Sequence, residues 1–251
     1  MDRERFQALC REALAGERRR EGIGTLGEKI LHAVLKAYFA GPGDGLEVPV
    51  GPFVADVQGP EGVVEIQTGN FRRLREKLPL FLSLGPVTVV YPVAAKKWLV
   101  WLEEDGTLTP RRKSPKAAGP WQVLPELYDI RDLLLAPGLR LCVALLELEE
   151  YRLKNGWGNG GKRGSTRQER LPLDLLEEVW AHSPKEWGRL LPRELPREFT
   201  AKDFSKLTKL SPKKTYFALG TLQAVEAVAR LGKRGNAYVY ERAPATGEKE
   251  D

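Results

Sequence analysis

The spacing of apolar residues predicts two helices at the start of the chain. Residues 2–20 and 26–40 each carry apolar side chains on one helical face and charged or polar side chains on the other. Before the second segment, Thr25 and Glu28 fit a capping box, with Thr at the N-cap and Glu three positions later. At about 100° per residue, Glu28 falls at the edge of the apolar stripe of that helix. Glu28 is therefore a cap, a carboxylate at the margin of the core, or both.

Between residues 46 and 93 the pattern is that of strands around one further helix. Val-rich stretches divided by Gly and Pro predict three short strands, at 46–50, 53–58 and 63–68. Helical spacing returns over 70–82, and the continuous apolar run at 87–93 predicts a buried strand. The order helix, three strands, helix, strand predicts an α/β (α+β) fold.

The middle of the chain is less regular. Residues 155–170 are rich in Gly and basic residues and contain almost no core-forming residue. This stretch, which includes Lys162 and Arg163, is interpreted as a linker, a DNA-contacting loop or a flexible β-wing. Residues 139–152 are compatible with either helix or strand. The remaining patterns predict a hairpin at 97–103 and 108–112, a short helix at 127–135 and a helix at 171–180.

Residues 196–243 show the order helix, turn, helix and basic hairpin, which is typical of a winged helix–turn–helix domain. Ser211 is a predicted N-cap, and Pro212 follows at the first helical position. A protein-interaction or dimerisation module is the alternative interpretation of this region. If it binds DNA, we expect contacts from the helix start and from the hairpin, through Lys213, Lys214, Thr215, Tyr216, Lys233 and Arg234.

These patterns divide the chain into four parts. Residues 1–138 form the first predicted domain. Residues 139–195 form a basic Gly-rich loop or linker with a helical region. Residues 196–243 form the predicted winged helix–turn–helix domain, and residues 244–251 form a disordered tail.

Composition says more about the size of the core and the cellular compartment than about the function of the protein. The chain has 251 residues, of which 42% are hydrophobic, so it can bury one large core or two or three small ones. The formal net charge of +6 favours polyanionic partners without identifying them. Cys10 and Cys142 lie far apart in the sequence and give no disulfide framework. Because there is neither a signal-peptide core nor an apolar run of about 18 residues, we expect a cytoplasmic protein with no membrane partner.

Two acids lie on the predicted hairpin of residues 53–68, one on each strand. Asp56 can supply a metal ligand from the first strand and Glu65 from the second, and Gln67 faces the same way as Glu65 because strand side chains alternate. Mg²⁺ prefers oxygen ligands, and a bound cation assists phosphodiester hydrolysis by neutralising charge and lowering the pKa of the attacking water. The plain alternative is that both acids are ordinary strand-end carboxylates, paired with Arg72, Arg73 or Lys77.

About residues 20–95 resemble the PD-(D/E)XK nuclease superfamily, which has the restriction-endonuclease-like fold. The resemblance rests on the order of Glu28, Asp56, Glu65 and Gln67 along the predicted elements and on the basic helix that follows them. It implies a mixed-sheet core of αβββαβ order, with Asp56 and Glu65 as ligands of Mg²⁺ or Mn²⁺ and Glu28 as a further ligand. Gln67 stands where the superfamily usually has Lys. Some members have Gln there, but Gln orients a water molecule without bringing a charge to it. The frequent Pro directly before the first acid is also missing.

The resemblance and the winged-helix pattern together predict a metal-dependent DNA endonuclease that serves DNA repair, recombination or restriction. Because one hairpin makes one nick, a homodimer would supply the two sites that a double-strand cut needs. Gln67 keeps one alternative open, a non-catalytic DNA-binding protein or regulator on a decayed nuclease core. A third interpretation is an RNA-processing nuclease. The sequence leaves the preferred DNA open among restriction sites, branched junctions, mismatches, lesions and single-strand ends.

Overall fold

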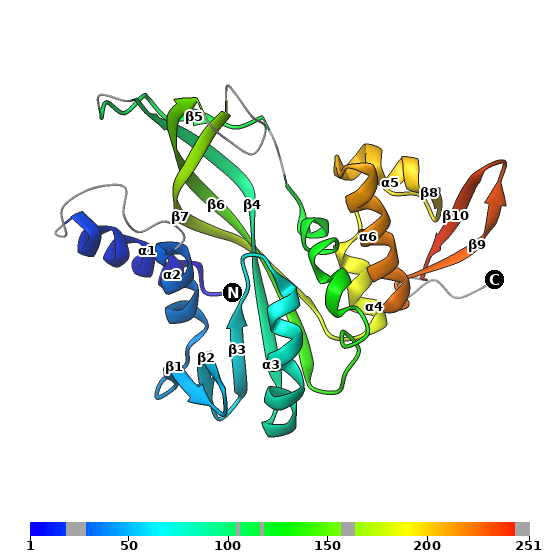
Figure 1. Cartoon of the computed structure of the whole chain (residues 1–251), viewed down its shortest axis with the longest axis horizontal. Coiled ribbons are helices and arrows are strands. Elements are labelled where there is room, and N and C mark those ends of the chain that lie inside the picture. The colour runs from blue at the N-terminus through cyan, green and yellow to red at the C-terminus, as the bar shows by residue number, and fades with distance from the viewer. Residues whose placement is uncertain (19–28, 104–105, 116–117, 157–163, 244–251) are drawn as a thin grey trace. The chain divides into compact units, whose positions relative to one another are not determined.

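The computed structural model of the chain describes residues 1–18, 29–103, 106–115, 118–156 and 164–243. The chain divides into two compact units, which we describe separately. Unit 1 comprises Met1–Pro42, Ala94–Ala117 and Leu145–Glu177. Unit 2 comprises Gly43–Val93, Ala118–Ala144 and Glu178–Asp251. Figure 1 labels the elements along the chain.

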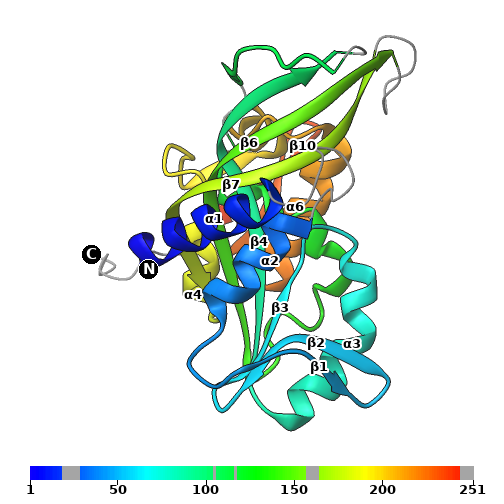
Figure 2. The ribbon, with the colours of Figure 1, turned by 90° about the vertical axis from the view of Figure 1, so that its left-hand side faces the viewer.

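Unit 2 begins with three antiparallel strands and a helical crossover. Strands β1 (Gly45–Val50), β2 (Phe53–Gly59) and β3 (Gly62–Ile66) pair in chain order. Helix α3 (Phe71–Leu84) then leads to β4 (Val87–Leu102), whose first residues pair with β3 in parallel. A parallel pair requires such a crossover because the chain must return to the same end of the sheet. Figure 2 shows α3 beside β1 and β2, and the rings of Phe53 and Phe81 meet edge-on at 6.2 Å.

The C-terminal part of unit 2 contains two helices and a small sheet. Strand β8 (Glu198–Thr200) precedes α5 (Ala201–Thr208) and α6 (Pro212–Ala224), and the hairpin of β9 (Val228–Arg234) and β10 (Ala237–Arg242) follows. The three strands form a sheet in the order β8-β10-β9. Thr200 and Asp203 form a capping box at α5. Ser211 caps α6 with Pro212 at its first position, as predicted. Short helical segments complete this unit: η1 (Pro120–Val123), η2 (Glu126–Ile130), α4 (Pro184–Trp187) and η3 (Gly188–Leu190).

Unit 1 combines two helices with parts of three long strands. Helices α1 (Arg3–Arg18) and α2 (Lys29–Phe39) pack against each other, and the rings of Phe6 and Tyr38 meet edge-on at 5.3 Å. Strands β6 (Leu139–Gly156) and β7 (Gly164–Ala181), like β4, contribute residues to both units. The short strand β5 (Arg112–Lys113) pairs with β4.

The large sheet has seven strands, in the order β1-β2-β3-β4-β6-β7 with β5 paired to β4. Because it contains antiparallel and parallel pairs and occurs with six α-helices in the described residues, the predicted α/β class with a mixed sheet is confirmed at this level. No helix of the described residues is both long and apolar enough to cross a bilayer.

The prediction of a helix at 171–180 is wrong, because these residues lie in β7. Residues 139–195, expected to be a loop or linker with a helical region, supply both β6 and β7 to the large sheet. The error has a physical cause. A strand whose two faces are both partly covered carries apolar residues on both, so its sequence shows no clear period of two. The short helix predicted at 127–135 is reduced to the 3₁₀ segment η2.

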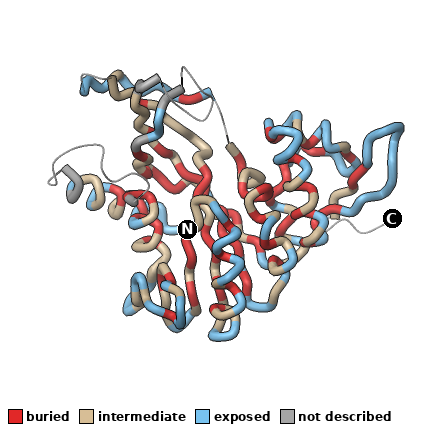
Figure 3. Tube along the Cα trace, in the orientation of Figure 1, coloured by how far each residue is buried: buried red, intermediate tan, exposed pale blue. Residues whose placement is uncertain are grey.

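Burial distinguishes the two ends of unit 2. Helix α3 buries one stripe at helical spacing, formed by Phe71, Leu74, Leu78 and Phe81. In contrast, every residue of β9 after Val228 is exposed. Figure 3 shows this contrast between α3, which has a buried face, and the hairpin, which is exposed along most of its length. The hairpin therefore contributes little to the core and leaves its side chains available for contacts.

The turn between β2 and β3 depends on Gly62. Its φ is +111°, and a Cβ atom there would lie 2.1 Å from the carbonyl oxygen of Pro86.

We expect Gly62→Ala to lower the free energy of unfolding by at least about 3 kcal/mol, because both the backbone conformation and the contact oppose a side chain. Gly43→Ala is the matched control. Its φ is +85° but nothing lies within 4 Å of the added Cβ, so we expect a loss of about 1–2 kcal/mol. Equal losses in urea denaturation would contradict this account.

Candidate active site

The hairpin of β2 and β3 brings Asp56 and Glu65 together. Val57 pairs with Val64 in the antiparallel register, and one further step along the strands sets Asp56 opposite Glu65. The two acids also bond to each other's strand. The backbone N–H of Asp56 donates to Oε1 of Glu65 at 3.2 Å, and the N–H of Ile66 donates to Oδ2 of Asp56 at 2.8 Å. The sequence-based expectation that these two carboxylates share one patch of sheet is met by this geometry.

Glu65 is buried, which is costly for a carboxylate. Its exposed fraction is 1%, and burial raises its pKa, a rise that the hydrogen bond from Lys77 opposes and the neighbouring Asp56 charge increases. Like charges directly opposite on adjacent strands destabilise a sheet. A buried acid that faces a second acid therefore needs a cation nearby.

Lys77 supplies a positive charge from α3. Its Nζ lies 2.9 Å from Oε2 of Glu65 and donates to the carbonyl oxygen of Val54 at 2.9 Å. It also lies 5.8 Å from the ring centre of Phe81. Lys77 follows Leu74 by three positions and precedes Phe81 by four, so it lies at the margin of the buried stripe of α3. The alternative that an acid of this hairpin pairs with Arg72, Arg73 or Lys77 is therefore confirmed for Glu65 and Lys77, and the helical spacing of Lys77 explains why it faces the hairpin.

Of the other two residues predicted for this site, the structure describes Gln67 but not Glu28. Gln67 is half-buried directly after β3, and its backbone N–H donates to the carbonyl oxygen of Val90 at 2.8 Å. Glu28, with its predicted capping partner Thr25, lies outside the described residues. Within the described residues, no group of three or more His, Cys, Asp or Glu side chains is arranged to hold a metal ion. The described part of the site is thus a pair of carboxylates with one lysine.

The predicted DNA-contacting residues of α6 divide into exposed and buried members. Lys213, Lys214 and Tyr216 are exposed at the start of the helix, and Tyr216 is 66% exposed. Nζ of Lys214 lies 3.3 Å from Oε1 of Glu126. The prediction that Thr215 is exposed is wrong, because its side chain is buried with an exposed fraction of 3%. Thr215 lies three and four positions before the buried Ala218 and Leu219 and so shares their helix face, whereas Tyr216 points about 100° away.

The hairpin tip presents cations around an aromatic ring. Lys233 and Arg234 are exposed, and Gly235 and Asn236 form the turn as predicted. The Lys233 ammonium lies 5.0 Å and the Arg230 guanidinium 4.6 Å from the ring centre of Tyr238. Arg234 also lies 3.2 Å from Glu198. The other two predicted contacts, Lys162 and Arg163, lie outside the described residues.

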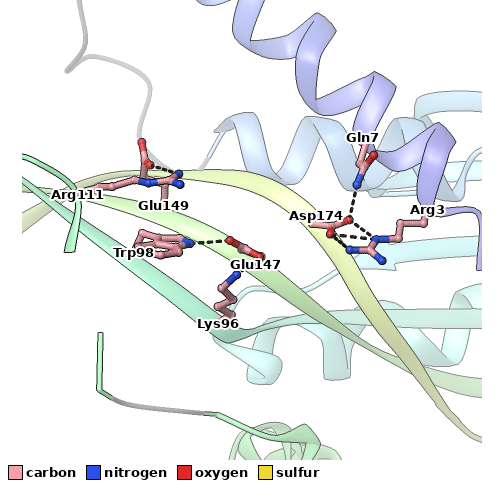
Figure 4. A network of polar contacts seen from close by, with 8 residues as sticks. All are labelled: Arg3, Gln7, Lys96, Trp98, Arg111, Glu147, Glu149 and Asp174. Atoms are coloured by element: carbon pink, nitrogen blue, oxygen red, sulfur yellow. Dashed lines mark hydrogen bonds and ion pairs between the residues drawn. The ribbon is translucent and has the colours of Figure 1, made fainter. Parts of the chain in front are cut away.

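Unit 1 contains a polar network that the sequence analysis did not find (Figure 4). Asp174 of β7 accepts hydrogen bonds from Arg3 and Gln7 of α1, and the Arg3 bonds hold its pKa below the usual value. Glu147 of β6 accepts from Trp98 at 2.6 Å and from Lys96 at 2.8 Å. Each acid in this network has a cationic partner, so we assign it to holding α1 and the strands of unit 1 together. The residues lie far apart in sequence, and periodicity carries no information about such pairs.

Comparison with known proteins places the chain in a family. Residues 29–182 match the family model described as Domain of unknown function (DUF8091), which is more than half of the chain. The chain belongs to the DUF8091 family. The DUF8091 match runs from α2 to just past the end of β7 and includes Asp56, Glu65 and Lys77, whereas α5, α6 and the β9–β10 hairpin follow it.

One similar protein carries no functional description. A protein of Treponema pallidum (strain Nichols), described as uncharacterized, is 29% identical over 223 residues, which cover 88% of each chain. No solved structure matches the chain. The similarity therefore extends beyond the residues of the DUF8091 match, because those residues make up a smaller share of the chain.

The raised pKa of Glu65 predicts how the stability of this DUF8091 protein depends on pH. Because the folded state holds the proton more tightly than the unfolded state, stability is highest below the unfolded pKa and falls as the pH rises through the folded pKa. Glu65→Gln imitates the protonated form. We expect this variant to be more stable than the wild type at pH 8 and the difference to vanish as the pH falls toward 4, measured by urea denaturation.

The control for this experiment is Glu61→Gln, which neutralises an exposed acid in the turn of the same hairpin. We expect it to track the wild type at each pH. A Glu65→Gln protein that is less stable than the wild type at pH 8 would show that the Lys77 ion pair outweighs the cost of burying the carboxylate.

Proposed function

We propose that the protein is a metal-dependent DNA endonuclease that hydrolyses phosphodiester bonds. The observation that carries the proposal is the apposition of Asp56 and Glu65 on adjacent strands, with Glu65 buried at 1% exposure. Burying an acid opposite another acid costs stability, and such arrangements gather at functional sites. Cation binding would explain why two acids are placed opposite each other, whereas core packing alone does not explain it.

The donor atoms fit a hard divalent cation. Mg²⁺ is usually held by one or two carboxylates, with waters and substrate phosphate completing its coordination. Asp56 and Glu65 supply two carboxylates, and each oxygen of a carboxylate can accept more than one bond, so their hydrogen bonds within the hairpin and to Lys77 do not exclude a metal. Mg²⁺ or Mn²⁺ bound there would neutralise charge on the phosphate and lower the pKa of the attacking water. The resemblance to PD-(D/E)XK nucleases adds Glu28 as a third ligand.

Two further side chains have roles in this proposal. Gln67 orients the attacking water by hydrogen bonding, in the position where the superfamily usually has Lys. Lys77 provides the positive charge that Gln67 lacks, because its ammonium already lies 2.9 Å from Glu65. An ammonium at that distance stabilises negative charge on the neighbouring phosphate in the same way that it stabilises the carboxylate.

The arrangement of elements supports the restriction-endonuclease-like assignment. Elements α2, β1, β2, β3, α3 and β4 follow one another in the chain, with β3 antiparallel to β2 and parallel to β4. The C-terminal order of two helices, hairpin and three-stranded sheet supports a winged helix–turn–helix assignment. The exposed cations of α6 and of the hairpin are suited to phosphate contacts, and Cys10 and Cys142, both free thiols, suit a reducing cytoplasm.

A non-catalytic DNA-binding protein is the second candidate, and the Glu65–Lys77 ion pair favours it. A lysine that neutralises the buried acid gives that acid a structural explanation without a metal. Binding without cleavage across duplex, mismatched, lesion-bearing, branched and single-stranded DNAs in Mg²⁺ and Mn²⁺ would support this candidate. Matched RNA substrates in the same panel would identify an RNA-processing nuclease.

The endonuclease proposal predicts that either acid is required for cleavage but not for binding. We expect Asp56→Ala and Glu65→Ala each to reduce Mg²⁺-dependent cleavage at least about 1000-fold, because the cation loses a ligand. DNA affinity measured by fluorescence anisotropy should stay within about twofold of the wild type, because phosphate contacts elsewhere provide most of it.

Glu61→Ala is the matched control, since it removes an exposed acid from the same hairpin and should leave cleavage unchanged. Thermal melting provides a readout independent of activity. Mg²⁺ should raise the melting temperature of the wild type and not of Asp56→Ala, because ligands that bind the folded state stabilise it. Metal-dependent cleavage that persists in both acid variants would overturn the proposal.

DNA binding through the hairpin predicts a change in salt dependence. Lys233 is exposed and lies beside Tyr238, so we assign it one phosphate contact. Lys233→Ala should lower the slope of log affinity against log salt by about one and weaken binding to all sequences alike. Lys202→Ala, which removes an exposed lysine of α5, is the comparison. An unchanged slope in Lys233→Ala would exclude the hairpin from the DNA contact.

A further inference from the structure

A pocket of about 380 Å³ lies in unit 2, between the start of α3, the segment η2 and the start of α6. This volume is within the range of small-ligand sites in proteins. Residues from all three elements line it, among them Asn70, Tyr128, Asp129, Lys213, Lys214 and Phe217. None of these residues belongs to the Asp56–Glu65 pair.

The walls of the pocket are tied together on both sides of η2. Arg75 of α3 donates to both carboxylate oxygens of Asp132, at 2.6 and 2.7 Å, and to the carbonyl oxygen of Asp129. On the other side, the buried hydroxyl of Thr221 in α6 donates to the carbonyl oxygen of Leu124 at 2.9 Å. A Cβ atom on Gly220 would lie 2.6 Å from the ring of Tyr128, so α6 and this ring are in close contact. The pocket is therefore set by packed elements within a single unit.

The lining offers three kinds of group at once. The rings of Tyr128 and Phe217 pack on each other with 4.6 Å between their centres, and the Arg131 guanidinium lies 4.0 Å from the centre of the Tyr128 ring. The Phe217 ring is therefore the one that offers a face to a nucleobase, and aromatic faces of this kind stack on bases. The carboxylates of Glu126 and Asp129 can accept hydrogen bonds from the amino groups of bases. Lys213 is exposed and provides a cation for a phosphate, and Lys214, also exposed, lies 3.3 Å from Glu126 and can exchange that ion pair for one with a phosphate. Aromatic rings, acceptors and cations together match the parts of a nucleotide.

Asn70 connects the pocket to the acid pair. It begins α3 in the left-handed region, with φ 54°, and its side chain makes no capping hydrogen bond, which leaves the amide for a ligand. Asn70 follows Glu65 by five residues, which span at most about 17 Å of extended chain. One strand of a duplex rises 3.4 Å per nucleotide, so the wall of the pocket formed by Asn70 lies within about five nucleotides of a phosphate held at the acids.

We propose that this pocket receives an unpaired nucleotide of the DNA substrate. The base stacks on Phe217, and its edge contacts Asn70 and Asp129. Lys213 holds the phosphate, and Lys214 joins it by exchanging its ion pair with Glu126 for one with the phosphate. The inference rests on the proposed function, and it narrows the substrate to DNA with an extruded or unpaired base, cut within about five nucleotides of that base. In a fully paired duplex the base would first have to leave the stack, at a cost that an unpaired base avoids.

The test compares a duplex that contains one unpaired 2-aminopurine with the matched duplex, using the wild-type protein in EDTA so that metal-dependent cleavage is stopped. We expect the bulged duplex to bind at least about tenfold more tightly in fluorescence anisotropy, the size of effect that stacking of one base supplies. The 2-aminopurine fluorescence should fall on binding, because an aromatic ring stacked on the base quenches it. Equal affinity for the two duplexes would overturn the inference.

Variants locate the effect in the pocket. Phe217→Leu keeps an apolar side chain but removes the stacking ring, and Lys213→Glu reverses the charge of an exposed lysine. Both should abolish the preference for the bulged duplex while the proteins melt like the wild type. Lys206→Glu, an exposed lysine of α5 outside the pocket, should retain the preference. A preference that survives in folded Phe217→Leu would overturn the assignment.

Cleavage in Mg²⁺ separates this inference from the proposed function. A bulge preference that depends on Phe217 without cleavage of any DNA would refute the nuclease and leave the pocket assignment standing. Cleavage that depends on Asp56 without a bulge preference would refute the pocket assignment and leave the nuclease standing. Where both hold, the cut positions on the bulged duplex should lie within about five nucleotides of the unpaired base.

Discussion

The contact between Glu65, Asp56 and Lys77 is the constraint on which the rest of unit 2 depends. Two acids face each other across adjacent strands, and one of them has almost no access to solvent. When both acids are charged, a nearby cation stabilises such a pair, and here the cation comes from α3, an element outside the β-hairpin. Hairpin, crossover helix and the parallel strand β4 must therefore be present together before the acids can be buried.

The crossover helix has two roles because of its position between β3 and β4. Its buried stripe packs on the sheet, and the residue at the margin of that stripe reaches the acids. Its first turn forms a wall of the pocket, next to η2 and α6. A single helix thus links the chemistry of the acid pair to the surface that would hold DNA. The acids of the unit 1 network also have cationic partners, but their side chains keep exposures of 11–16%, against 1% for Glu65.

The sequence predicted helices and strands better than it predicted the contacts between residues that are distant in the chain. Alternation and Gly-Pro punctuation were sufficient to find β2, β3 and the opposed acids, and cap signals located α6 at Ser211 and Pro212. Strand β7 was mistaken for a helix because a strand with two partly covered faces has no clear period. The sequence left Lys77 as one of three candidate partners of the acids and gave no sign of the pocket, for a different reason. Both depend on contacts between residues distant in the chain, such as Lys77 with Glu65 and Gly220 with Tyr128, which no local pattern encodes.

The close packing of Gly220 against Tyr128 has a mechanical consequence. Gly220 of α6 packs against Tyr128 of η2, and Arg75 of α3 bonds to Asp129 of η2, so a shift of the helix that would read DNA relative to α3 would break these contacts. A recognition helix on a flexible tether lets an enzyme cut at variable distances from the feature it recognises. A recognition helix fixed in the same compact unit acts instead as a ruler, with one offset between the recognised nucleotide and the bond that is cut.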